Sequence, residues 1–325
     1  IAQAWGSGPS GRYEAIAAPF RPIFEQIAIG AVQRELQRKL PFEELARLRD
    51  SGFMALRVPP SYGGLGITLP EYFNLLIELA WVDSNLTQAV RGHAGFVENV
   101  LNAHDARFRE SWLTRIGNEK VFAGPAWTEP GNATQAVFAT RVRRQGDHYL
   151  LSGTKFYTTG ALYADWIEVG CVDDDDVAVS AVVRRDDPGV RIEDDWDGFG
   201  QKLTASGTIH FDNVHVAATN LSLAEAGCRY ITGFYQLFHL ATLAGIGRRL
   251  SDEAAQAVRD RKRNFSHANA ALARHDPQVL QVIGQLRGAA YAAGSIVLKN
   301  AEALQRAYQT PVSYTHLRAH ETPEH

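Results

Sequence analysis

Three segments of the sequence combine hydroxyl groups with aromatic rings, the groups needed to hold a flat polar heterocycle. The first segment begins with Trp127, Thr128 and Glu129 and ends at Thr134. Its hydroxyl and backbone groups can bond to the polar edge of such a ring while the indole covers a face. Taken by itself, this segment is better explained as an ordinary turn between domains.

Two later segments repeat the combination. One follows an expected strand and carries Tyr157, Thr158 and Thr159 in succession. The other spans residues 196–208, begins with Trp196 and leads into a further expected strand. The three segments together form a much more specific pattern than any one of them.

One histidine has the chemistry of a proton donor. An unperturbed imidazole has a pKa of about 6.5, so His93 can act as a general acid near neutral pH. It lies at the start of an expected helix over residues 92–99. A histidine in such a place is more often a cap or a core residue, and the residue types alone favour that alternative.

The first third of the chain is expected to be helical. From residue 12 to about 118, apolar residues recur at helical spacing. Residues 58–66 interrupt this pattern with prolines and glycines, which favour a loop. We predict an N-terminal helical domain over residues 1–120.

Strands replace helices from residue 121 onward. Runs with strand character occupy residues 136–142, 148–151 and 166–170. Residues 145–147 predict a hairpin turn, and the four aspartates at 173–176 indicate a solvated turn more than a cation site. We predict a middle β-domain, a barrel or sandwich, over residues 121–221.

Helical spacing returns after about residue 222 and continues to Tyr308. Two or three helices fit this length, whereas a bundle usually needs four to close its core. We therefore predict an incomplete C-terminal helical bundle over residues 222–310 in an α+β protein. Residues 311–325 do not continue the helical spacing of apolar residues, and they resemble a translated cloning tail. We therefore expect a C-terminally truncated chain.

The composition excludes several classes of function. Lys and Arg number 33 against 36 Asp and Glu, and this net charge of −3 gives no electrostatic footprint for nucleic acid. No stretch reaches the roughly 18 apolar residues of a membrane span, and no signal sequence is evident, so we expect a cytoplasmic protein. Cys171 and Cys228 lack metal or redox spacing, and no metal site is expected.

In order and spacing, the three segments resemble those of the acyl-CoA dehydrogenase superfamily, over roughly residues 12–308. Within it, the chain is similar to the flavin-dependent monooxygenase branch, the family of dibenzothiophene monooxygenase and related sulfur-acquisition oxidoreductases. This finer resemblance rests on His93, on Trp196 and on the sequence of residues 200–208. Pro125 departs from it, because that branch places an asparagine there.

The resemblance implies a flavin site on the middle domain. Thr159 would bond to the flavin N5 position and Thr128 to the pyrimidine edge, while Trp127 and Tyr157 pack around the ring and Thr158 contributes backbone. The implied flavin-binding residues of this domain are Trp127, Thr128, Thr134, Tyr157, Thr158 and Thr159.

The resemblance also implies residues outside that domain. Arg261 or Arg263, followed by Phe265, would reach the flavin of a neighbouring subunit, although a solvated basic helix end is an equal alternative. His93 would act as a general acid together with Thr159. The implied substrate pocket contains Phe96, Trp196, Tyr235 and His239. For Tyr235 and His239, helical core packing is the alternative.

The implied function is an FMNH2-dependent monooxygenase that takes reduced flavin from a partner reductase and oxygenates a small organosulfur or aromatic substrate. The alternative is an FAD-dependent acyl-CoA dehydrogenase. A third possibility is a non-catalytic flavin-binding subunit or an inactive fragment. Both enzymatic alternatives imply a homotetramer.

Overall fold

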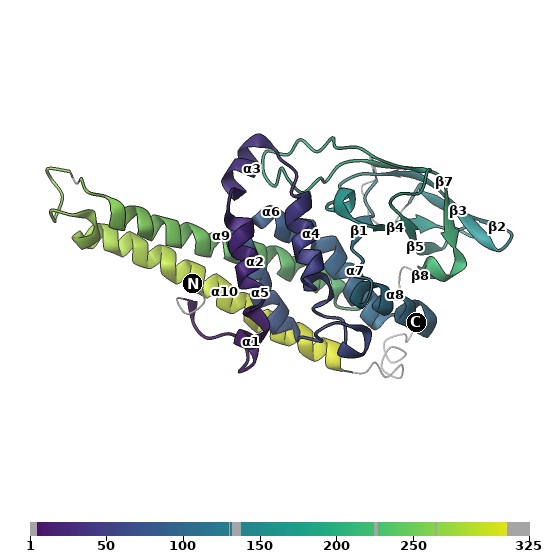
Figure 1. Cartoon of the computed structure of the whole chain (residues 1–325), viewed down its shortest axis with the longest axis horizontal. Helices are drawn as coiled ribbons and strands as arrows, with labels where there is room; N and C mark the ends of the chain where they lie inside the picture. The colour runs from purple at the N-terminus through teal and green to yellow at the C-terminus, as the bar shows by residue number, and fades with distance from the viewer. Residues whose placement is uncertain (1–4, 130, 132–137, 224–226, 264, 311–325) are drawn as a thin grey trace, which may run out of the picture.

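The computed structural model describes residues 5–129, 131, 138–223, 227–263 and 265–310. Helices fill the first third of the described chain, strands follow, and two long helices come last (Figure 1). This order confirms the predicted α+β fold. Thr134 and the tail at 311–325 lie outside the described residues.

Most of the first helices pack around one apolar core, and a second core lies between the last of these helices and the sheet. The first helices are α1 (Tyr13–Ala17), α2 (Arg21–Ala28), α3 (Ala31–Gln37), α4 (Phe42–Asp50), α5 (Leu69–Val82), α6 (Ser84–Ala89), α7 (Arg91–Asn102) and α8 (Ala106–Gly117). The short 3-10 helices Phe53–Ala55 and Pro60–Tyr62 separate α4 from α5. Residues from α9 and α10 belong to the first of these cores, so the two helical parts of the chain are packed as one unit.

Helix α5 shows how the sequence fixes a helix start. The Thr68 hydroxyl accepts the backbone N–H of Glu71 at 3.4 Å, while the Glu71 carboxylate accepts the backbone N–H of Thr68 at 2.8 Å. This reciprocal capping satisfies two donors that a helix start leaves open. The helix then buries Phe73, Leu76 and Ile77 completely, as their spacing predicts.

The predicted loop at 58–66 also follows from its residue types. Gly63 has a φ of +89°, a conformation that side chains disfavour. A Cβ added to Gly64 would collide with the carbonyl oxygen of Val58. Glycine is therefore required where the chain turns back on itself between α4 and α5.

The middle of the chain forms one connected sheet. Its strands are β1 (Ala123–Ala126), β2 (Arg141–Gln145), β3 (His148–Lys155), β4 (Trp166–Val172), β5 (Ala178–Arg184), β6 (Val190–Ile192), β7 (Ile209–Ala217) and β8 (Leu221–Leu223). The strand order is β6-β7-β3-β2-β4-β5-β8, and β1 pairs with β4 in parallel. The sheet has its own apolar core, built from alternate residues of β3, β4, β5 and β7.

Two predicted turns of the sheet have the expected form. Gln145 pairs with His148, so Gly146 and Asp147 make a two-residue hairpin turn. Between β4 and β5, the Asp173 carboxylate accepts the backbone N–H groups of Asp175 and Val177 at 3.0 and 2.9 Å. These hydrogen bonds show that the four aspartates at 173–176 form a turn, as predicted. The strand predicted at 136–142 begins only at Arg141 among the described residues.

The last two helices form a long antiparallel pair. Helix α9 (Ile231–Asp260) packs against α5 and α10 (Pro277–Gln309), and the far end of the pair projects away from the sheet (Figure 1). Several apolar residues of this pair are exposed, including Leu240, Leu243, Leu250, Val282 and Ile296. Among the described helices, none has both the length and the apolar character needed to cross a membrane.

Candidate functional site

The first and second predicted segments meet at a backbone bridge. The N–H of Phe156 donates to the carbonyl oxygen of Thr128 at 2.8 Å, in an isolated antiparallel bridge. This pairing places Trp127 opposite Tyr157. Within the described residues the hydroxyl of the half-buried Thr128 makes no hydrogen bond, which leaves it available to a ligand.

The second and third segments are locked together by Thr158 and Gly160. The backbone N–H and the hydroxyl of Thr158 both donate to the carbonyl oxygen of Gly207, at 3.3 and 2.9 Å. The N–H of Gly160 donates to the carbonyl oxygen of Thr204 at 2.9 Å. Because both donors of Thr158 are used inside the protein, Thr158 positions its neighbours, and the prediction that its backbone binds flavin is not supported by this geometry.

A chain of three buried hydroxyls continues from Thr159. The Thr204 hydroxyl donates to the carbonyl oxygen of Gln201 at 2.9 Å, so the Ser206 hydroxyl, 2.8 Å away, must donate to Thr204. The Thr159 hydroxyl, 2.8 Å from Ser206, must in turn donate to Ser206. The direction of this chain leaves the Thr159 oxygen as an acceptor with a free lone pair.

An aromatic pair lies beside this hydroxyl chain. The rings of Tyr157 and Trp196 are 5.7 Å apart in an edge-to-face arrangement, and the indole N–H of Trp196 donates to the carbonyl oxygen of Gln201 at 2.9 Å. Tyr157 has a φ of +54°, which is unusual for a residue with a side chain, and its ring is 53% exposed. Such strain with exposure is common where a side chain serves a ligand.

A buried ion pair holds the first segment against the second. The Lys155 ammonium donates to the Glu129 carboxylate at 2.7 Å, and Glu129 also accepts the backbone N–H groups of Ala139 and Thr140. Burial alone would raise the pKa of Glu129, but the bonds from Lys155 and the backbone outweigh it and lower the pKa to about 2. Burial acts in the opposite direction on Lys155 and lowers its pKa, against the attraction of Glu129. The short contact and the backbone donors indicate a charged pair.

Trp127 turns its indole toward a second buried carboxyl group. Its ring N–H donates to Glu168 at 3.4 Å, and the Ser180 hydroxyl donates to the same carboxyl group at 3.2 Å. Burial raises the pKa of Glu168 to about 7. Trp127, Glu168 and Phe96 line a cavity of about 330 Å³, a size suited to a small molecule.

His93 lies in the protein interior and not at an open site. Its side chain is 2% exposed, the backbone N–H of Ala123 donates to Nδ1 at 3.1 Å, and Nε2 is 3.0 Å from the carbonyl oxygen of Met54. Nδ1 must therefore be unprotonated, and the single ring proton on Nε2 is donated to Met54. Burial lowers the pKa of His93 to about 4. The predicted role as general acid is not supported, because both nitrogens hold the fold together.

The environment of His93 predicts a pH effect on stability. Between pH 6.5 and 4 the unfolded chain would bind a proton at His93 that the native protein does not. The contribution of His93 to the free energy of unfolding should therefore fall by up to about 3 kcal/mol as the pH drops through this range. Glu168 has the opposite effect on the free energy of unfolding. Because its pKa is raised in the native protein, its protonation stabilises the native protein as the pH falls below 7.

The contributions of His93 and Glu168 to stability oppose each other. The effect of His93 is therefore measured by comparing a His93 variant with the parent protein at each pH. We expect the difference in unfolding free energy between the parent and His93→Gln, from urea titrations, to shrink as the pH falls from 7 to 4. The exposed His104 provides the control, since His104→Gln should leave the difference constant. Parallel parent and His93→Gln curves would contradict the buried neutral imidazole.

Of the predicted substrate-pocket residues, Phe96 alone lines the cavity that Trp127 also lines. Phe96 is 1% exposed and packs on Trp112 with ring centres 5.1 Å apart, although it also lines the cavity with Trp127. Trp196 contacts Tyr157 instead. Tyr235 is half-buried, with its hydroxyl packed against Gly95 of α7, whereas His239 is exposed. For Tyr235, packing against α7 is thus the better description.

Arg261, Arg263 and Phe265 follow the end of α9, at the end of the long helix pair that projects away from the sheet (Figure 1). Arg261 stacks on the ring of Phe265 at 5.1 Å and donates to the carbonyl oxygen of Arg263 at 2.9 Å. The structure therefore does not bring these residues to Thr159 of the same chain. Their contact with the flavin of a neighbouring subunit stays a prediction.

Sequence reasoning missed several residues that the structure places at the site. Ser206 and Thr204 lie in the third segment, and their hydroxyls complete the chain from Thr159. Glu168 is a charged residue inside the otherwise apolar strand β4, which is a signal that could have identified it. Lys155 belongs to the second segment but had no assigned partner.

The fold and the site define a class of proteins in which a sheet follows an N-terminal helical part and precedes a C-terminal helix pair in the sequence, with a hydroxyl-rich junction on the sheet. The family descriptions "Acyl-CoA dehydrogenase, N-terminal domain" and "Acyl-CoA dehydrogenase, middle domain" match residues 14–120 and 124–214, together more than half of the chain. The chain belongs to the acyl-CoA dehydrogenase family.

Among its relatives are monooxygenases. The "Probable FMNH2-dependent monooxygenase SfnC" of Pseudomonas putida is 27% identical over 82% of this chain and 67% of that protein. A dibenzothiophene monooxygenase of Rhodococcus qingshengii is 26% identical over 88% of this chain and 72% of its own length. The solved structure of methanesulfinate monooxygenase MsuC from Pseudomonas fluorescens superimposes with a TM-score of 0.81 at 26% identity, covering 90% of this chain and 76% of that one.

Proposed function

We propose that this protein is a monooxygenase that uses reduced FMN, supplied by a partner flavin reductase, to oxygenate a small organosulfur or aromatic compound. Family membership and the three monooxygenase relatives support this proposal. The observation that carries it is the directed hydroxyl chain, which leaves the oxygen of Thr159 as a hydrogen-bond acceptor.

The residues present fit a reduced flavin. A reduced flavin carries a hydrogen on N5, and an acceptor oxygen at Thr159 suits that donor. The free hydroxyl of Thr128 would meet the polar edge of the ring, and Tyr157 and Trp127 would cover it. When bound, reduced flavin supplies the two electrons with which one atom of O2 is transferred to the substrate while the other leaves as water.

The chain itself positions and shields these groups. Thr204 and Ser206 fix the direction of the Thr159 hydroxyl, so the acceptor is prepared before any ligand arrives. Trp196 and Tyr157 would exclude water from the ring. The small substrate would occupy the cavity that Phe96 and Trp127 line, where aromatic walls suit a thioether or a thiophene.

The proposed function is tested with the reaction itself. A flavin reductase, NADH, FMN and thioanisole in air should give methyl phenyl sulfoxide, with one oxygen atom from 18O2, only when this protein is present. Methanesulfinate provides a second, anionic substrate probe. Reduction of an electron acceptor by an acyl-CoA thioester, with no sulfoxide, would instead establish an acyl-CoA dehydrogenase. Absence of both activities and of flavin binding would leave a non-catalytic chain.

We also propose a homotetramer that works in the cytoplasm. The exposed apolar residues Leu240, Leu243 and Leu250 on α9 favour association with other copies. An assembly would also allow Arg261 or Arg263 of one copy to reach the flavin of another. The free thiols of Cys171 and Cys228 are compatible with a reducing compartment.

The oligomer proposal predicts the effect of one substitution. Leu243 is 62% exposed on α9, so Leu243→Glu should not unfold the chain but should place a charge in the contact between copies. Light scattering during size exclusion should show four chains for the parent and smaller species for the variant. Gln145→Glu adds the same charge at an exposed position of β2, outside α9, and should remain tetrameric. A monomeric parent would refute the proposal.

A further inference from the structure

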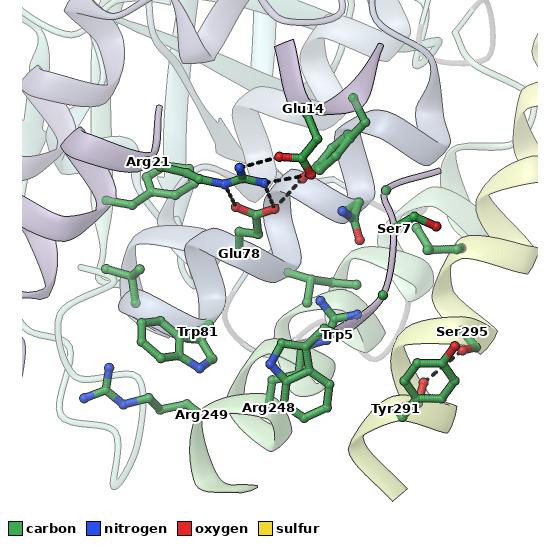
Figure 2. Close-up of a pocket in the computed structure, with 18 of the residues that line it drawn as sticks. Trp5, Ser7, Glu14, Arg21, Glu78, Trp81, Arg248, Arg249, Tyr291 and Ser295 are labelled. Carbon is green, nitrogen blue, oxygen red and sulfur yellow. Dashed lines mark hydrogen bonds and ion pairs between the residues drawn. The ribbon is translucent and has the colours of Figure 1, made fainter. Parts of the chain in front are cut away.

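A second and larger cavity lies away from the hydroxyl chain. Its volume is about 620 Å³, and it is enclosed by the segment before α1 together with α1, α2, α5, α9 and α10 (Figure 2). None of the residues predicted to bind flavin or substrate lines it. Its volume is within the usual range for small-molecule sites and far exceeds the needs of a single inorganic ion.

Most of the charged groups in its wall are paired. Arg21 donates to Glu14 at 2.6 Å and to Glu78 at 3.0 Å, as the dashed lines of Figure 2 show. Arg249 pairs with Glu253 at 2.5 Å and stacks on the indole of Trp81 at 4.6 Å. These groups need no ligand.

Two charged groups of the wall have no charged partner among the described residues, the exposed Glu25 and the buried Arg248. Only Arg248 is buried. It is only 7% exposed, and its Nε is buried without a hydrogen-bond partner in the described part of the chain. Its guanidinium lies 5.1 Å from the ring centre of Trp5 and against the backbone of Gly294. Burial lowers the pKa of Arg248, which shows how poorly its charge is compensated. An uncompensated buried cation is costly to a fold.

The carboxylates nearest to Arg248 are already engaged. Asp252 accepts the indole N–H of Trp81 at 2.9 Å and an N–H of Arg287 at 2.8 Å. Glu78 accepts Arg21 and, at 2.8 Å, the hydroxyl of Tyr13. These carboxylates attract Arg248 from a distance but form no ion pair with it among the described residues. The guanidinium thus remains available to an anion inside the cavity.

The other walls are suited to a flat aromatic body. Trp5, Trp81, Phe24 and Tyr291 line the cavity, and Figure 2 shows Trp5 next to Arg248, with Tyr291 across from it on α10. Aromatic rings pack favourably against aromatic ligands, and a guanidinium binds a carboxylate or sulfonate through two parallel hydrogen bonds. One ligand that satisfies both features is an aromatic acid.

We propose that this cavity is a second ligand site, separate from the flavin site, which binds a planar aromatic carboxylate or sulfonate. The anionic group pairs with Arg248, and the ring packs against the aromatic and apolar residues of the facing wall. The site is kept at a cost in stability, because the free protein buries a cation that only the ligand neutralises.

Calorimetric titration of the 325-residue chain with 2-naphthoate and naphthalene-2-sulfonate tests the proposal directly. We expect both anions to bind with one-to-one stoichiometry, and the neutral 2-naphthamide to bind at least about tenfold more weakly, as expected for loss of one charged hydrogen-bonded pair. Saturating FMN should leave the affinity for 2-naphthoate unchanged. Equal binding of the amide, absence of binding, or competition by FMN would each overturn the proposal.

Two variants separate this site from general charge attraction. Arg248→Met should weaken 2-naphthoate binding at least about tenfold. It should also melt at the same temperature as the parent or higher, because a buried unpaired charge is removed. Arg259→Met removes the same charge from an exposed position of α9 outside the cavity and should retain most of the affinity. A large fall in the melting temperature of Arg248→Met, or equal losses in both variants, would refute the assignment.

Discussion

The Thr159→Val variant is expected to oxygenate thioanisole about 100-fold more slowly than the parent when reduced FMN is supplied. Valine has nearly the shape of threonine but removes the oxygen that accepts a hydrogen bond. Loss of one buried hydrogen bond to a cofactor costs about 1 to 3 kcal/mol, or roughly 5- to 150-fold in rate. Sulfoxide formation per minute, with the reductase in excess, measures the effect.

Two companion variants show whether the oxygen itself is responsible. Ser206→Ala interrupts the hydroxyl chain but leaves the Thr159 oxygen in place, so its rate should fall less than that of Thr159→Val. Thr154→Val removes a hydroxyl of β3 that bonds to His210 instead, and its rate should equal that of the parent. If Thr159→Val were as active as Thr154→Val, the assigned role of Thr159 would be wrong.

The Lys155→Met variant is expected to lower the free energy of unfolding by about 3 to 5 kcal/mol. The side chains of Lys155 and Glu129 are 0% and 4% exposed, so removal of the ammonium takes this ion pair away from a buried carboxylate. Because Glu129 also ties the first segment to the start of β2, local order there should be lost as well. Urea denaturation followed by circular dichroism gives the measurement.

The exposed pair of Arg184 and Asp186 provides the matched control. Its side chains are 60% and 61% exposed, so Arg184→Met should change stability little. If both methionine variants were equally stable, the buried pair would not be the link between the two segments that the geometry indicates. The Glu129→Gln, Lys155→Met double variant should recover part of the loss, since the buried negative charge is then removed together with the positive one.

The sequence predicted the fold well where one periodic signal dominated. In α5 the helical spacing of Phe73, Leu76 and Ile77 matched the buried face. The hairpin at Gly146 followed from its turn residues. The strand predicted at 136–142 was less accurate, since among the described residues pairing begins at Arg141. Pairing partners, and not residue types, decide where a strand begins.

The candidate site was predicted in outline only. The three segments do converge, but sequence cannot show the direction of a hydrogen bond, so Ser206 and Thr204 were not recognised as part of it. His93 illustrates a different limit. The resemblance implied acid catalysis, whereas in the structure Ala123 and Met54, both remote in sequence, contact its two nitrogens. Only tertiary contacts distinguish a structural histidine from a reactive one.

The central claim is that the site is prepared for reduced flavin by an acceptor oxygen at Thr159. The most direct test is the affinity of the parent protein for reduced and oxidised FMN, titrated without oxygen and followed by flavin fluorescence and calorimetry. Reduced FMN carries a donor at N5, whereas oxidised FMN presents an acceptor there. We expect reduced FMN to bind at least about tenfold more tightly, and this preference to disappear in Thr159→Val. Equal affinity for the two forms, or tighter binding of oxidised FMN, would contradict the account.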